Sequence, residues 1–112
     1  MTKKLRIALD YDNTFTADPM FWQYFVEMAK DYGHTVTIVT MRSATIDAIA
    51  DHVLKDVPVG LIYCDGNPKR KYCKDNHDTE FDIWIDDHPE GIHLGSAYTP
   101  EQLIEWRANG RV

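Results

Sequence analysis

The sequence has little of what marks secreted, membrane-spanning or nucleic-acid-coating proteins. It has only two cysteines, Cys64 and Cys73, and nothing in it indicates export, so we expect reduced thiols in a cytoplasmic protein. No apolar run approaches the roughly 20 residues that span a bilayer, and the basic N-terminal residues reach acidic ones too soon for a signal peptide. The formal net charge of −6 argues against broad binding to nucleic acid or anionic membranes, which leaves only a local basic patch open.

Repeats, linkers and low-complexity tracts are also absent, so we expect a single domain over residues 1–112. The hydrophobic content of 44%, with three Trp, six Tyr and four Phe, is ample for one packed core. Four apolar runs have the length and composition of strands, and there is a weaker fifth candidate. The four runs are residues 5–9, 35–39, 59–63 and 81–85, and the weaker one is 92–94.

Helical segments are expected between these runs. Asp18 followed by Pro19 is typical of a helix start, and Gly33 of a helix end. Further helix starts are expected at Ser43, Pro68 and Thr99. Helical spacing predicts that the core faces are Phe21, Tyr24, Phe25 and Met28 in the first helix and Ile46, Ile49, Ala50, Val53 and Leu54 in the second.

The alternation of strands and helices predicts an α/β domain with a three-layer, Rossmann-like fold, in which helices cover both faces of a mostly parallel sheet. In such sheets ligands bind beyond the carboxyl ends of the strands. Polar residues gather at these ends here. Asp10 and Asp12 follow the first run, Thr40 follows the second, and Asp86 and Asp87 follow the fourth. We therefore expect these side chains at one edge of the sheet.

Four carboxylates at one edge repel one another, and some would be driven to bind protons. A divalent cation removes the repulsion, and Mg²⁺ prefers carboxylate, water and phosphate oxygens. Taken alone, the stretch Asp10–Thr14 also fits an Asx-rich turn after a strand. The second acidic pair after another strand makes Mg²⁺ the favoured interpretation.

A phosphate monoester dianion repels an attacking carboxylate, so a site for it needs cations and hydrogen-bond donors around the phosphoryl group. The sequence offers Thr40 and the basic stretch 69–71. The alternatives are that Thr40 is only a strand-end residue and that the basic stretch is a solvated helix face. Lys69 lies where a first-turn side chain can point back to the sheet edge, and Lys71 is the second candidate.

The order "DYDNT", "IVTMR", "NPKRKYC" and "IWIDD" resembles the four motifs of the haloacid dehalogenase-like (HAD) phosphohydrolases, over residues 5–87. The resemblance implies a phosphatase in which Asp10 is the nucleophile that forms an aspartyl-phosphate. Asp12 would be the general acid and then the general base, Thr40 would bind a phosphoryl oxygen, and Lys69, or else Lys71, would stabilise the charges. The metal set implied for Mg²⁺ is Asp10, Asp12 through its carbonyl, Asp86 and Asp87. The substrate-binding set implied is Asn13, Thr14, Met41, Arg42 and Lys71.

Family members commonly carry a cap after the first motif or between the second and third, and neither interval here has room for one. We therefore expect a small, capless member with an open site. Such a site is covered either by a bulky phosphorylated substrate, such as a nucleotide, a nucleic-acid end or a phosphoprotein, or by another subunit of a homo-oligomer.

Three other interpretations stay open. A phospho-accepting domain of the receiver type also combines acids, Thr, Lys and Mg²⁺, but its acidic pair comes first in the chain. A catalytically silent HAD-fold binding module is disfavoured because all four motif positions carry competent side chains. Zinc binding by Cys64, Cys73 and His77 lacks the paired ligand spacing of structural zinc sites.

Overall fold

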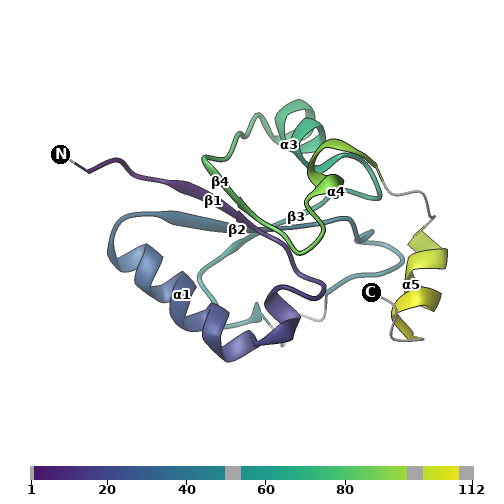
Figure 1. The fold of residues 1–112 in the computed structure, drawn as a ribbon, viewed down its shortest axis with the longest axis horizontal. Helices are drawn as coiled ribbons and strands as arrows, with labels where there is room; N and C mark the ends of the chain where they lie inside the picture. Colours follow the sequence, from purple (N-terminus) through teal and green to yellow (C-terminus); the bar gives the residue numbers. More distant parts are fainter. Residues whose placement is uncertain (1, 50–53, 96–99, 109–112) are drawn as a thin grey trace.

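The computed structural model describes residues 2–49, 54–95 and 100–108. The described elements are four strands and five helices, drawn in Figure 1. The strands are β1 (Arg6–Leu9), β2 (Thr35–Thr40), β3 (Gly60–Tyr63) and β4 (Ile83–Ile85). The helices are η1 (Phe15–Ala17), α1 (Pro19–Asp31), α3 (Lys69–His77), α4 (Glu90–His93) and α5 (Pro100–Ala108). No helix among the described residues has the length and apolarity needed to cross a bilayer.

The four strands form one parallel sheet in the order β3-β2-β1-β4, which confirms the expected α/β class. Leu9 is paired with Ile38 on one side and with Ile85 on the other, so β1, β2 and β4 end at the same edge. That edge receives the polar residues that follow the strands. The register therefore brings segments from both ends of the chain together.

Helices pack against both faces of this sheet. Ile7 and Leu9 point to one face, where they pack with Val26 of α1. Ala8, between them in sequence, points to the other face and packs with Cys73 of α3. This alternation is the two-residue period of a strand that is buried on both sides.

The prediction of a fifth strand at residues 92–94 is wrong, because this segment overlaps the short helix α4. Pro89, with φ of −63°, sets a helical start, and the amide of Leu94 donates to the carbonyl of Glu90 at 2.9 Å. Ile92 is buried and Leu94 is exposed, so the segment has too little apolar surface facing inward for a sheet position.

The start of α1 is confirmed, but of its expected core face only Phe25 is confirmed. The Asp18 carboxylate accepts a hydrogen bond from the amide of Phe21 at 3.2 Å, the N-cap that its sequence predicts. The row that faces the sheet is Trp22, Phe25, Val26 and Ala29, of which Val26 and Ala29 are fully buried. Of the residues expected in the core, Phe21, Tyr24 and Met28 are exposed. Both rows have helical spacing, and the row with the small Ala29 is the one that lets the helix lie close to the sheet.

The helix expected from Ser43 is absent over residues 44–49, because residues 44–46 form a turn and residues 47–49 have no regular structure. The amide of Ile49 donates to the hydroxyl of Tyr63 at 3.0 Å, so it does not enter an intrahelical ladder. Ile49 is buried as expected, whereas Ile46 is exposed. Two other residues expected on this core face, Ala50 and Val53, lie outside the described residues, as does the N-cap expected at Thr99.

Candidate active site

Three carboxylates meet at the carboxyl ends of β1 and β4. Asp10 follows β1 and is held there by a hydrogen bond of 2.9 Å from its amide to the carbonyl of Ile85 in β4. One oxygen from each of Asp10, Asp86 and Asp87 lies within 4.8 Å of the others. Asp10 is only 8% exposed, so its charge is poorly solvated. The structure thus brings together the first and fourth sequence motifs as expected.

Lys69 supplies the positive charge of this cluster. Its Nζ lies 2.8 Å from Asp10 Oδ1 and 2.6 Å from Asp86 Oδ2, and the residue is 4% exposed. Lys69 is the first residue of α3, so its side chain reaches back over the end of the sheet. Lys71 lies on the outer side of the same helix, where it pairs with Asp75 in solvent. Of the two lysines considered from the sequence, Lys69 is the one at the carboxylates.

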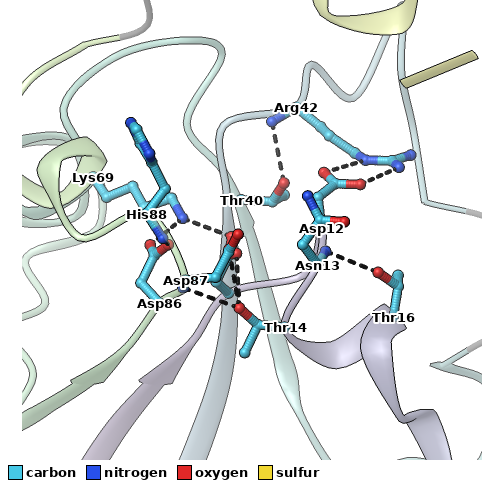
Figure 2. Close-up of polar contacts among 11 residues, drawn as sticks. Asp12, Asn13, Thr14, Thr16, Thr40, Arg42, Lys69, Asp86, Asp87 and His88 are labelled. Atoms are coloured by element: carbon cyan, nitrogen blue, oxygen red, sulfur yellow. Dashed lines mark hydrogen bonds and ion pairs between the residues drawn. The ribbon is translucent and has the colours of Figure 1, made fainter. Parts of the chain in front are cut away.

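The hydroxyl of Thr14 joins the two acidic segments. Its Oγ1 lies 3.1 Å from Asp10 Oδ2 and 3.1 Å from Asp87 Oδ1, and it accepts a hydrogen bond of 3.2 Å from the amide of Asp87 (Figure 2). The preceding residue, Asn13, has a left-handed φ of 62°, which turns the loop, and its amide donates to Thr16 Oγ1 at 2.9 Å. Thr14 is therefore placed to fix the spacing of the carboxylates.

The carboxylates and the lysine perturb one another. Burial raises the pKa of Asp10 from 3.8 to about 8, against the opposing charge of Lys69, and Asp87 and Asp86 add to the rise. Burial disfavours the charged form of Lys69, but Asp10 and Asp86 outweigh this and raise its pKa. Three carboxylates against one ammonium leave an excess of negative charge, which either a proton on Asp10 or a bound cation can relieve.

The side chain of Asp12 points away from the three carboxylates, toward Arg42. Arg42 donates from Nε to Asp12 Oδ2 at 2.9 Å and from Nη2 to Asp12 Oδ1 at 2.6 Å, a forked ion pair (Figure 2). The guanidinium is itself fixed by the ring of Tyr11, 5.0 Å away, and by Asp47 at 3.4 Å. Sequence reasoning placed Arg42 near the substrate but missed this pairing, which no spacing in the sequence signals.

Thr40 is the last residue of β2, and Met41 follows it. Thr40 is buried, and its Oγ1 accepts a hydrogen bond of 3.2 Å from the amide of Arg42, which leaves the hydroxyl proton to be donated. Met41 instead packs against α4. Its Cε lies so close to Gly91 that a Cβ added to this glycine would be only 2.9 Å away. The role expected of Thr40 stays a prediction, while Met41 makes a packing contact.

Zinc ligation gains no support from the described residues. Cys64 and Cys73 are both fully buried in the apolar cluster between the sheet and α3. Within residues 2–49, 54–95 and 100–108, the only group of three or more metal-ligating side chains at suitable distances is Asp10, Asp86 and Asp87. Its donors are all carboxylate oxygens, the chemistry that suits a hard cation such as Mg²⁺.

Comparisons of this chain with protein-family models, with curated proteins and with solved structures found no match.

Proposed function

We propose that this protein is a small, capless phosphatase of the HAD-like type, with a three-layer Rossmann-like fold, that hydrolyses phosphate monoesters with Mg²⁺. The main support for the proposal is the environment of the Asp10 side chain. A nearly buried carboxylate at the end of a parallel strand touches the ammonium of Lys69 and lies within metal-sharing distance of Asp86 and Asp87. A structural ion pair between Asp10 and Lys69 would not need two further carboxylates within 4.8 Å of Asp10. A phosphoryl-transfer site that binds Mg²⁺ does need such carboxylates.

The residues fit a Mg²⁺ ion by the chemistry of their donors. Asp10, Asp86 and Asp87 would hold it, with the carbonyl of Asp12. When bound, Mg²⁺ would neutralise charge on the phosphoryl oxygens and on the carboxylates. Lys69 adds a second positive charge next to Asp10, and the hydroxyl of Thr40 provides a donor for a phosphoryl oxygen.

In the first step, a carboxylate oxygen of Asp10 attacks phosphorus, the ester P–O bond breaks, and the leaving oxygen takes a proton from Asp12. In the second step, water attacks the phosphorus of the aspartyl-phosphate, Asp12 takes the proton of that water, and the P–O bond to Asp10 breaks to release phosphate. The fork with Arg42 occupies both side-chain oxygens of Asp12 and directs them away from Asp10. Asp12 must therefore leave Arg42 and hold a proton, taken from solvent or from the attacking water of the preceding turnover, before it protonates the leaving oxygen. The phosphate of a substrate is a competing partner for the guanidinium.

A site without a cap would leave room for a bulky phosphate. We extend the proposal to nucleotides, nucleic-acid ends and other large monoesters in the cytoplasm. Asn13 and Thr14 in the first loop and Arg42 beside it are the substrate-binding candidates that lie at the site. Lys71 and Met41 remain predictions that contact other parts of the molecule.

The test is hydrolysis of an aryl phosphate by Asp10→Asn, with and without Mg²⁺. The variant should fold, because Asn keeps the shape of the side chain, and should lose essentially all activity. Asp75→Asn is the matched control, because Asp75 is exposed on α3 and pairs there with Lys71. Wild-type rates in Asp10→Asn would remove Asp10 from the chemistry and with it the proposed function.

A further inference from the structure

The outer side of α1, together with its C-cap residue Tyr32, carries a row of large apolar side chains that no described segment of the chain covers. Met20, Phe21, Tyr24, Met28 and Tyr32 are between 56 and 75% exposed. They stand beside the row that packs on the sheet, so α1 is apolar on two adjoining faces. Figure 1 shows α1 along one side of the sheet, with no described element over its outer side.

The size of this surface is that of an interface. Buried aromatic side chains each cover roughly 150–250 Å², so three aromatic and two methionine side chains that are more than half exposed present on the order of 500 Å². The largest exposed apolar patch of a soluble monomer is commonly about 300–600 Å² and is often functional. Two such surfaces packed together would bury on the order of 1,000 Å², the lower end for a specific interface.

The order of residues in the row favours a second copy of this chain as the partner. Met20, Tyr24, Met28 and Tyr32 follow one another at intervals of four residues, which makes a single ridge on a helix. If two such helices cross in antiparallel orientation about a twofold axis, Tyr24 of each copy meets Met28 of the other. The same register sets Met20 against Tyr32. Both methionines of the ridge, Met20 and Met28, then meet an aromatic ring, a contact that is favourable beyond the area it buries.

We propose that two copies of this chain form a twofold dimer by packing their α1 helices antiparallel, with the ridge Met20, Tyr24, Met28 and Tyr32 at the centre. An isologous interface needs a surface that is complementary to itself, and the alternation of Met and Tyr provides it. The ridge itself contains no charged residue, and the charged residues next to it, Glu27 and Asp31, are exposed. This association does not depend on the phosphatase activity.

Light scattering and sedimentation of the full chain test the dimer, and two single substitutions test its register. The wild type should have twice the chain mass at micromolar concentrations. Tyr24→Glu and Met28→Lys should each raise the dissociation constant at least ~100-fold, because either change buries two unpaired charges at the axis. Both side chains are exposed in the single chain, so both variants should keep the wild-type circular dichroism spectrum.

An equimolar mixture of the two variants is the decisive sample. In a mixed dimer, the new carboxylate of one copy faces the new ammonium of the other, so the mixture should recover a dimer that neither variant forms alone. Gln23→Glu adds the same charge on the polar side of α1 and should leave the dimer intact. A wild type at the chain mass, a dimeric Tyr24→Glu, or a mixture that stays monomeric would each overturn the proposal.

Discussion

The guanidinium of Arg42 holds both carboxylate oxygens of Asp12, at 2.9 and 2.6 Å, beside the ring of Tyr11. Both side chains of this pair are largely shielded from solvent, with 17% and 21% of their surface exposed. The pair ties the loop after β1 to the loop after β2. It therefore has a structural role before any substrate arrives.

Arg42→Met should lower the free energy of unfolding by roughly 1–3 kcal/mol, because Asp12 and Asp47 lose a shielded cationic partner. Lys71→Met breaks the exposed pair with Asp75 and should change the free energy by at most about 0.5 kcal/mol. Urea denaturation of both variants without substrate measures the contrast. Equal effects would show that the fork contributes no more than a surface pair.

Asp12→Asn should slow hydrolysis by about 10²–10⁴-fold, since Asn can neither protonate the leaving oxygen nor activate water. Steady-state and single-turnover rates with an aryl phosphate separate the two steps. Asp18→Asn is the control, because Asn replaces Asp as an N-cap with little loss. An Asp12→Asn rate within a factor of two of the wild type would contradict the acid/base role.

Lys69→Ala should reduce kcat by several orders of magnitude, while Lys71→Ala should stay close to the wild-type rate. The reason is geometric, since Lys69 Nζ contacts both Asp10 and Asp86 and Lys71 pairs with Asp75 on the opposite side of α3. The two variants remove the same side chain from the same helix, so each controls for the other. A larger loss in Lys71→Ala would reverse the assignment.

Sequence patterns predict the strand ends better than they predict side-chain packing and contacts between loops. Strand ends were predictable, because apolar runs stop where Asp10, Thr40 and Asp86 begin, and the parallel order then fixes their meeting point. The face of α1 was not, since its sequence contains two apolar rows of helical spacing and only the packing on the sheet chooses between them. The Arg42–Asp12 fork was also beyond reach, because it depends on the relative position of two loops.

The segment after Arg42 shows how a long-range contact can replace a helix that the local sequence predicts. Ser43 and the apolar spacing that follows predict a helix, yet the amide of Ile49 is bound by the hydroxyl of Tyr63 in β3. Arg42 also reaches Asp47 in the same turn. Long-range contacts of this kind override local propensity.

The raised pKa of Asp10 predicts a pH-dependent response to Mg²⁺. A carboxyl whose pKa rises on folding contributes stability that is fully present below its unfolded pKa of 3.8 and is lost as the pH rises through about 8. Mg²⁺ competes with the proton on Asp10, so its apparent affinity should increase with pH up to about 8 and then level off.

Thermal unfolding with EDTA or with excess Mg²⁺ across this pH range measures both effects. The stabilisation by Mg²⁺ should be larger near the upper end of the range than near its lower end. Asp10→Asn should remove most of this difference, since the titrating group is gone. Equal stabilisation by Mg²⁺ at every pH would exclude Asp10 from the cation site.

The most direct measurement is chemical trapping of the phosphorylated side chain. Borohydride reduces an acyl phosphate to an alcohol, so quenching the protein with borohydride during hydrolysis should convert residue 10 to homoserine, as read by peptide mass spectrometry. We predict this conversion at Asp10 only, and only when both Mg²⁺ and the phosphate ester are present. Steady hydrolysis with residue 10 unmodified, or trapping at a different carboxylate, would contradict the account.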